Sequence, residues 1–306
     1  MDNKVRAARI SVISNSALVL MKLVVGIVMG SVSVISEAIH SGLDLAASLI
    51  AFFSVKKASQ PADEVHQFGH GKMENISGVI EALLIFLAAI WIIFEAIKKL
   101  SHSVPVESIG LGIIVMGIAS LTNLLVSRYL FQTANKTDSI ALKADALHLS
   151  TDVITSIGVM AGLILIKFTG FQTLDPLIAI GVALLIMKAS YNLTKEAFLP
   201  LVDTKLPEEE EQIIVDIIKE YKNNFVEFHK LRSRKAGAER HIDLHLVVPR
   251  NAAVKDVHEI CDQIEKEIKN HFALSHVLIH VEPCQAKYQD CSCCILCKKN
   301  RLDKDS

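Results

Sequence analysis

The sequence predicts a polytopic α-helical membrane protein with six transmembrane helices, joined to a cytosolic domain of the α+β class. Three observations predict this fold class. Hydrophobic residues make up 51% of the 306-residue chain, which is more than soluble domains usually contain. These residues gather in long runs within about the first two hundred positions, and charged residues dominate the last hundred. The formal net charge of −1 leaves no basic surplus for binding nucleic acid.

The transmembrane helices are predicted from apolar windows of about 20 residues, the length that crosses a bilayer. Basic residues precede the first window, but no small-residue cleavage site follows it, so we interpret it as a span and not as a signal peptide. The fifth window is the least apolar, because it begins IALKADALHLSTD, and this favours a helix that lines a wet cavity. The predicted spans cover about residues 10–29, 32–55, 76–97, 109–131, 140–168 and 174–199.

The orientation follows from the basic residues of the short loops, because cytoplasmic loops carry an excess of Lys and Arg. With the N-terminus inside, the cytoplasmic side collects Lys4, Arg6, Arg9, Lys56, Lys57, Lys72, Arg128, Lys136, Lys143, Lys195 and Lys205. The opposite side has Lys98, Lys99 and Lys167. We therefore expect a multi-pass membrane protein with both termini in the cytoplasm, in the inner or plasma membrane if the source is bacterial.

An eight-residue pattern occurs twice, as EAIHSGLD at residues 37–44 and as DALHLSTD at residues 145–152. The two copies lie in the second and fifth spans, which run antiparallel in this topology. Two three-helix halves of opposite orientation are typical of secondary transporters, whose binding site lies between the repeats. An inverted repeat is therefore our hypothesis for the membrane domain.

Each copy places His and Asp four residues apart, which puts both side chains on one face of a helix, about 6 Å apart along its axis. Two such helices would offer two imidazoles and two carboxylates, a tetrahedral set suited to Zn²⁺. Mg²⁺ favours fewer imidazoles and Cu⁺ favours sulfur. The predicted metal ligands are His40, Asp44, His148 and Asp152.

The alternative is that these polar groups serve helix packing, although four unpaired ionisable groups would cost roughly 10 kcal/mol in a bilayer. Glu37 and Asp145 lie about one turn earlier on the same faces. We interpret them as entry groups or helix-pairing residues and not as ligands.

After the sixth span, a second domain begins at LPEEEEQ, where Pro and Glu favour a helix N-terminus. The alternation in HIDLHLVV predicts a strand, and DVHEICDQIEKEIKNHF has helical periodicity. The order is helix, strand, strand, helix, strand, at about residues 208–222, 227–235, 240–248, 254–271 and 276–282. Such an αββαβ order predicts a small sheet with helices on one face. The chain is thus divided into residues 1–206, 207–286 and a Cys-rich tail at 287–306.

Four segments carry a resemblance to a known family: GSVSVISEAIHSGLDLAASL, QPADEVHQFGHGKMEN, ALKADALHLSTDV and VLIHVEPC. Together they resemble the cation diffusion facilitators, divalent-metal transporters that include bacterial ferrous-iron and zinc efflux pumps, over about residues 5–285. The resemblance implies that His40, Asp44, His148 and Asp152 form the transport site. His in both copies of the pattern implies Zn²⁺ as the substrate, with Co²⁺, Cd²⁺ and Fe²⁺ left open.

The same resemblance implies further metal sites. Asp63, His66 and His70, with the two imidazoles four apart as in a helical turn, would bind a second, more exposed metal ion, unless the loop is only a solvated surface. The last domain resembles a metallochaperone and would form the homodimer. Its matched residues, which in the family gather a two-metal cluster near the dimer contact, are His229, His245, His258, His280 and Glu282. Several family members have Asp in place of Glu282. His241 is interpreted as a solvated residue.

Lys72 and Asp203 match positions that form an ion pair in the family, which implies a hinge between the membrane and cytosolic domains. The tail sequence CSCCILCKKN lies outside the family core. Four of its thiols, Cys291, Cys293, Cys294 and Cys297, could bind one soft or borderline metal ion. An idle tail is the alternative, and a cytosolic location disfavours disulfides.

The expected function is therefore proton-coupled efflux of a divalent cation by alternating access, in a homodimer that contacts the bilayer, divalent cations and protons. Zn²⁺ would be the substrate and also a structural or regulatory ion, and no organic cofactor is expected. A membrane metal sensor without translocation is the first alternative. An intramembrane zinc hydrolase is disfavoured, because catalytic zinc keeps a position open for water and the chain contains no HExxH motif or nucleophile elbow. The protein is not expected to be an enzyme.

Overall fold

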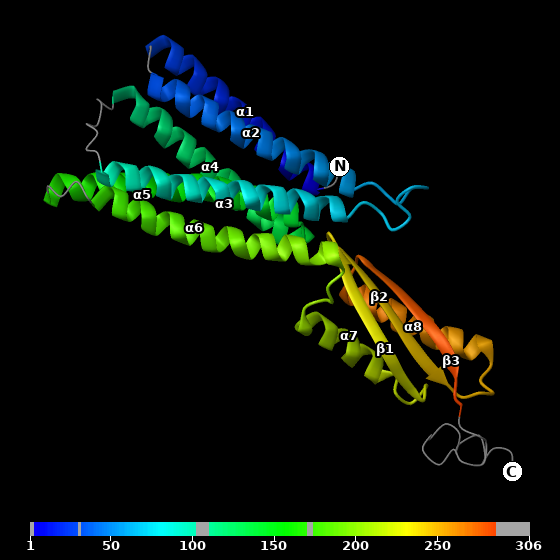
Figure 1. Cartoon of the computed structure of the whole chain (residues 1–306). Helices are drawn as coiled ribbons and strands as arrows, with labels where there is room; N and C mark the ends of the chain where they lie inside the picture. Colours follow the sequence, from blue (N-terminus) through cyan, green and yellow to red (C-terminus); the bar gives the residue numbers. More distant parts are fainter. Residues whose placement is uncertain (1–2, 30–31, 102–109, 170–173, 286–306) are drawn as a thin grey trace. The chain divides into compact units, whose positions relative to one another are not determined.

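The computed structural model describes residues 3–29, 32–101, 110–169 and 174–285 (Figure 1). It divides into two compact units, Met1–Leu201 and Val202–Ser306. The first unit is helical and the second contains a small sheet with two helices. Each unit is described below by itself.

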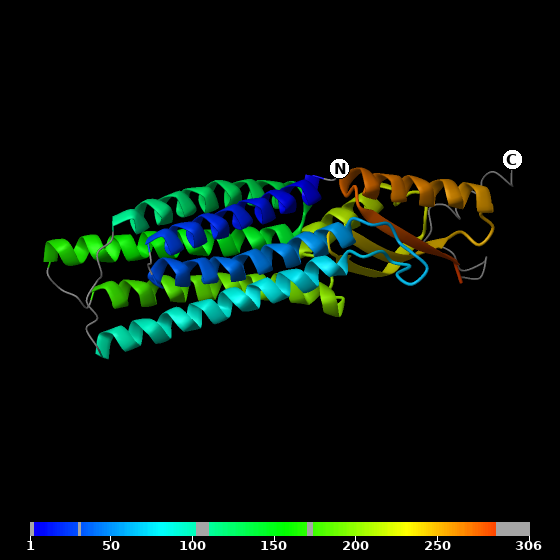
Figure 2. The ribbon, with the colours of Figure 1, turned by 90° about the horizontal axis from the view of Figure 1, so that it is seen from above.

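The helical unit consists of long helices that run side by side (Figure 2). They are α1 (Asn3–Met29), α2 (Val32–Ala58), α3 (Lys72–Ser101), α4 (Gly110–Thr137), α5 (Ile140–Thr169) and α6 (Leu174–Phe198), followed by the short 3₁₀ helix η1 (Leu199–Val202). The closest pairs are α1 with α2, α3 with α6 and α4 with α5. The end of α2 packs against the start of α5, since Val55 and Leu142 share one buried cluster. The two helices that carry the repeated pattern are therefore antiparallel.

The six predicted spans correspond to these six helices. Four of the helices have described segments that are long and apolar enough to cross a membrane, namely Asn3–Val28, Ala38–Ala58, Lys72–Lys98 and Pro176–Val202. Over their described residues, α4 and α5 do not meet the same criterion. The helical membrane fold is confirmed. Of the six predicted spans, four are confirmed by length and composition.

Small residues allow the helices to approach closely, as is common in membrane bundles. Ala7 and Ala8 of α1 are buried in one cluster with Ala141 and Ala146 of α5. Gly78 of α3 faces α5 and α6, where an added Cβ atom would lie 3.2 Å from the Ala197 Cβ atom. Large apolar side chains point outward instead, among them Trp91, which is 69% exposed. This outer surface suits contact with lipid.

The sheet unit has the element order that was predicted, with boundaries within about two residues. Its elements are α7 (Glu208–Glu220), β1 (Glu227–Ala236), β2 (Glu239–Val248), α8 (Val254–His271) and β3 (Ser275–Pro283). Strand β2 is central, antiparallel to β1 and parallel to β3. Gly237, with a φ of 61°, makes the tight connection between β1 and β2.

Both helices of this unit cover one face of the sheet. The buried residues Ile242, Leu244 and Leu246 of β2 pack with apolar residues of α7 and α8, among them Ile214, Ile218, Val257, Ile264, Ile268 and Phe272. Because side chains alternate along a strand, His241, Asp243 and His245 lie on the opposite face. The fold thus separates an apolar face from a face that carries histidines.

Candidate metal centres

The first candidate centre joins α2 and α5 inside the helical unit. His40, Asp44 and Asp152 each offer one ligand atom, and these three atoms lie within 4.8 Å of one another. The fourth predicted ligand, His148, is in contact with this group, because its Nε2 atom lies 3.0 Å from Asp44 Oδ1. The structure therefore brings the four residues together from two helices, as the repeated pattern predicted. That they bind a metal ion stays a prediction.

Polar residues from two further helices surround this centre. Asn123 of α4 donates from Nδ2 to Asp152 Oδ2 at 3.4 Å, which orients one carboxylate. Lys22 of α1 is buried, and its Nζ atom donates to Ser41 Oγ at 2.6 Å. Its charge also acts on Asp152. Asn123 and Lys22 are each a polar residue inside an apolar run of the sequence. This signal could have identified both of them, but our sequence interpretation did not use it.

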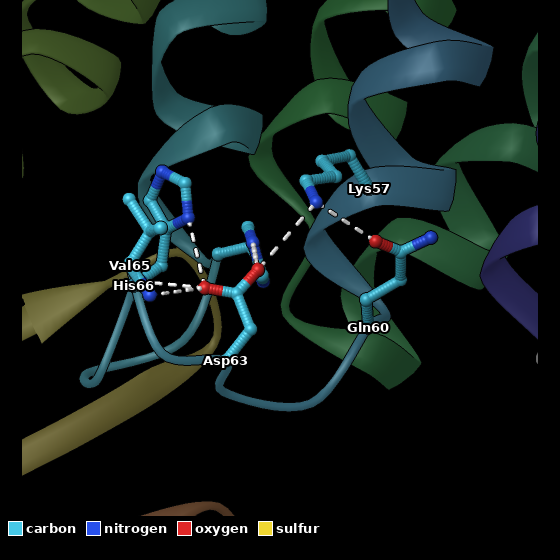
Figure 3. A network of polar contacts seen from close by, with 6 residues as sticks. Lys57, Gln60, Asp63, Val65 and His66 are labelled. Carbon is cyan, nitrogen blue, oxygen red and sulfur yellow. Dashed lines mark hydrogen bonds and ion pairs between the residues drawn. The ribbon is translucent and has the colours of Figure 1, made fainter.

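The second candidate centre is the loop between α2 and α3, where Asp63 holds two imidazoles (Figure 3). Asp63 Oδ1 lies 3.1 Å from His66 Nδ1, and Asp63 Oδ2 lies 3.1 Å from His70 Nε2. The two rings have centroids 4.6 Å apart. His70 is buried, whereas His66 and Asp63 are exposed. The segment is not helical, in contrast to the helical turn suggested by the spacing, and Gly69, with a φ of 79°, makes the turn between the two histidines.

Backbone amides fix the Asp63 carboxylate in this loop. Oδ1 accepts hydrogen bonds from the His66 and Val65 amides at 2.6 and 3.0 Å (Figure 3). The hydrogen bond from the His66 amide lowers the pKa of Asp63 to about 2, because it favours the ionised form. The carboxylate is therefore ionised throughout the pH range in which imidazoles titrate.

We expect Asp63→Ala to remove one metal ion from the stoichiometry of the full-length protein, with at least about a 10-fold loss of affinity at the loop. The physical reason is that both imidazoles lose the carboxylate that they share, His66 at Oδ1 and His70 at Oδ2. Glu64→Ala, which changes the neighbouring exposed acid, is the matched control. Zinc titration followed by calorimetry measures both variants, and an unchanged stoichiometry in Asp63→Ala would contradict the loop site.

The third candidate centre is a row of histidines across the sheet. His229, His245 and His280 face one another in register on β1, β2 and β3. Glu282 joins them: its carboxylate lies 2.7 Å from His245 Nδ1 and 3.3 Å from His229 Nε2. The hydrogen bond with His245 lowers the pKa of Glu282. His229, His245 and Glu282 meet the geometric condition for a shared metal ion.

His258 does not join this row within one chain. It lies on α8, exposed, and pairs with Asp262 at 3.5 Å, while α8 covers the opposite face of the sheet. The four other predicted residues of this cluster lie together, with the His280 Nε2 atom 3.9 Å from Glu282 Oε1. A role for His258 in the cluster stays a prediction.

His241 is not solvated, in contrast to our expectation. Only 9% of it is exposed, and its ring stacks on His276 at a centroid distance of 5.0 Å. Burial lowers the pKa of His241 to about 4, with a further contribution from the charge of Arg234. Strand alternation alone would leave His241 exposed on its face of the sheet. The cross-strand neighbour His276 covers it.

This pKa predicts acid sensitivity of the sheet. An unfolded histidine titrates near pH 6.5, so the unfolded chain takes up a proton that folded His241 resists. Stability is therefore full above about pH 6.5 and falls as the pH drops from there towards 4. We expect His241→Gln to reduce this acid-induced loss of protection in β2 and β3, measured by hydrogen–deuterium exchange of the full chain at pH 7 and 5. His271→Gln on α8 is the control, and equal acid sensitivity of the two variants would refute the assignment.

Two further predictions are not decided by the geometry. The tail residues Cys291, Cys293, Cys294 and Cys297 lie outside the described residues. Lys72 Nζ donates to the Leu201 carbonyl oxygen at 3.4 Å within the helical unit, and Asp203 pairs with Arg234 at 3.2 Å within the sheet unit. The ion pair between Lys72 and Asp203 would join the two units and stays a prediction.

Comparisons with protein families cover nearly the whole described chain. Residues 8–202 match the cation efflux transmembrane domain. Residues 206–284 match the cytoplasmic domain of cation efflux proteins.

Individual relatives show the same coverage. The transporter sll1263 of Synechocystis sp. is 37% identical over 254 residues, 83% of this chain and 82% of the relative. The cation-efflux pump FieF of Klebsiella pneumoniae is 34% identical over 278 residues, 91% of this chain and 92% of the relative. Among solved structures, the Zn form of the transporter CzrB is 33% identical, covers 28% of this chain and 98% of that chain, and has a TM-score of 0.26.

Proposed function

The chain belongs to the cation efflux family, the cation diffusion facilitators, and we propose that it exports a divalent metal ion, Zn²⁺ foremost, in exchange for protons. Members of this family are transporters and not enzymes. The observation that carries the proposal is the convergence of His40, Asp44, His148 and Asp152 between two antiparallel helices. These residues would bind the transported ion as substrate.

The donor set supports zinc. Two imidazoles and two carboxylates form a borderline set that Zn²⁺ accepts in tetrahedral geometry. With bonds of about 2.0 Å, ligand atoms of such a site lie about 3.3 Å apart. The atoms of His40, Asp44 and Asp152 lie within 4.8 Å of one another, so small side-chain movements are enough to close the site. Cd²⁺, Co²⁺ and Fe²⁺ are the competing substrates.

The contact between His148 and Asp44 supports the exchange with protons. A hydrogen bond at 3.0 Å requires one proton between the imidazole nitrogen and the carboxylate oxygen. Where His148 is an imidazolium, a metal ion that coordinates both atoms releases this proton to solution, so metal and proton compete for the same place. A proton gradient directed inward would then drive the release of metal outside.

We further propose that the protein acts as a homodimer through its cytosolic domain, with alternating access of the α2–α5 centre. The match to the cytoplasmic domain of cation efflux proteins supports the first part. The antiparallel arrangement of α2 and α5 supports the second, because it is the arrangement expected of an inverted repeat. Cytoplasmic termini and a bacterial inner-membrane location belong to the same proposal.

One observation favours a second function, metal sensing by the sheet unit. The row of His229, His245 and Glu282 lies outside the membrane helices and could bind metal without transport. A sensor, however, has no use for a four-residue centre between two membrane spans. We therefore assign the row a regulatory or structural part within the transporter.

Flux of single metal ions from reconstituted vesicles tests the proposal. The full-length protein is placed in liposomes with an imposed pH gradient, and Zn²⁺, Cd²⁺, Co²⁺, Fe²⁺ and Mn²⁺ are followed separately against protein-free liposomes. We expect zinc flux that depends on the gradient and exceeds the flux of the other ions. Binding of zinc without flux would favour the sensor, and flux that ignores the pH gradient would refute the antiport.

A further inference from the structure

Two acidic side chains lie completely buried where α3 packs against α5. Glu81 and Asp145 both have 0% exposure, and their neighbours in sequence, Ala82 of α3 and Ala144 of α5, share one buried cluster. Asp145 precedes His148 by three residues on α5. Neither acid belongs to the four-residue centre, and the transport mechanism described above does not use them.

The oxygen atoms of this acidic pair are almost without hydrogen bonds. The Ser77 hydroxyl donates to Glu81 Oε1 at a long 3.4 Å. Glu81 Oε2 and both carboxylate oxygens of Asp145 have no hydrogen-bond partner among the described residues. Buried carboxylate oxygens in this situation are rare and costly, because they have lost water and gained nothing in return.

An independent polar group points to the same place from α1. Ser11 is 0% exposed and lies beside Asp145, but no hydrogen bond of good geometry joins its hydroxyl to the carboxylate. Asn15, one turn further along α1, is 3% exposed, and its Nδ2 atom also has no hydrogen-bond partner among the described residues. A hydroxyl can donate or accept, so the lining of this site can satisfy a carboxylic acid as well as a carboxylate.

The charges around the pair do not neutralise it. The charged group that acts on Glu81 is Asp145, and the charged group that acts on Asp145 is His148. His148 already pairs with Asp44. Two ionised carboxylates would repel each other in a medium of low dielectric, and sites of this kind avoid the repulsion by keeping one acid protonated.

We propose that Glu81 and Asp145 form a second proton-binding site, in which at least one of the two is a neutral carboxylic acid at neutral pH. A proton fits the donor set better than a metal ion does. Zinc takes four ligands, with imidazole or thiolate among them in most sites, and the pair offers two carboxylates and neighbouring hydroxyls. The absence of exposed surface on either acid also disfavours an ion that must shed a hydration shell there.

Infrared spectroscopy of the full-length, metal-free protein in lipid tests the proton directly. A neutral carboxylic acid has a C=O stretching band that a carboxylate lacks. We expect this band at neutral pH in the wild-type protein and its loss in the double variant Glu81→Gln with Asp145→Asn. Glu95→Gln, the same substitution on the same helix at a partly exposed acid, is the matched control and keeps the band. An identical band in the double variant would overturn the proposal.

Two measurements keep the test decisive. If the double variant does not fold, Glu81→Gln alone must shift or remove the band, and an unchanged spectrum again overturns the proposal. Zinc titration of the same proteins distinguishes a bound proton from a bound metal ion. We expect equal zinc stoichiometry in wild type and variant, and the loss of one bound ion in the variant would identify a metal site instead. Failure of the proposed transport would appear in the flux measurement and leave the spectrum unaffected.

Discussion

Replacing His148 by alanine is expected to reduce zinc flux through reconstituted vesicles by at least about 100-fold, to the level of protein-free liposomes. Changes to groups that only orient metal ligands already cost about 10- to 100-fold in affinity, and His148 would itself be a ligand. The variant also leaves Asp44 without the imidazole that lies 3.0 Å away.

Three further variants define this prediction. His40→Ala is expected to cause a similar loss, because it removes the other imidazole. Asn123→Ala is expected to cause a smaller loss, about 10-fold, because Asn123 only orients the Asp152 carboxylate. His271→Ala, on α8 and outside every candidate centre, should transport like the wild type. Wild-type flux in both His40→Ala and His148→Ala would show that the transported ion does not bind at this centre.

The apparent zinc affinity of the α2–α5 centre is expected to fall steeply in acid. Zinc binds neutral imidazole, so protons compete with it at His40 and His148. Where a bound proton must be lost, each imidazole costs about 10-fold in apparent affinity per pH unit. For the two imidazoles together, the limit is about 100-fold per unit.

This measurement needs a protein in which the loop centre and the sheet centre no longer bind zinc. Asp63→Ala and His245→Ala remove the shared carboxylate of the loop and the central imidazole of the sheet row. Calorimetric zinc titrations of this double variant at pH 7, 6 and 5 then report the α2–α5 centre. Adding His40→Gln should lower the slope towards about 10-fold per unit. An affinity that does not change with pH would refute competition between metal and protons.

Much of the fold follows from local patterns in the chain. Apolar runs of about 20 residues predicted the positions of α1 to α6, and alternation in HIDLHLVV predicted β2. These predictions succeeded because hydropathy and side-chain periodicity depend on neighbours in sequence. The helix ends were less well predicted: α3 begins at Lys72, before the apolar window at 76–97, because charged residues at a bundle end can continue a helix.

The candidate centres, too, were predicted from the sequence only where local spacing decides the geometry. The spacing of His and Asp in the repeated pattern already places both side chains on one helix face. In the loop, by contrast, the same four-residue spacing between His66 and His70 suggested a helical turn, and the structure has a non-helical loop that Asp63 and Gly69 shape. For His241, alternation identified the correct face of the sheet, but burial beside His276 depends on how the strands pair.

The sequence by itself determined the division into apolar and charged regions, the order of helices and strands, and the residues of the α2–α5 centre, because helix and strand geometry is set by a few consecutive residues. Only the tertiary structure decided which polar groups meet. Glu81 and Asp145 are separated by 64 positions, and Glu81 belongs to no motif, yet both lie buried, and three of their four carboxylate oxygens have no hydrogen-bond partner among the described residues. Packing between helices has no fixed period in the sequence, so the pairing of these two acids, and the proton that it requires, emerges only when α3 and α5 are placed side by side.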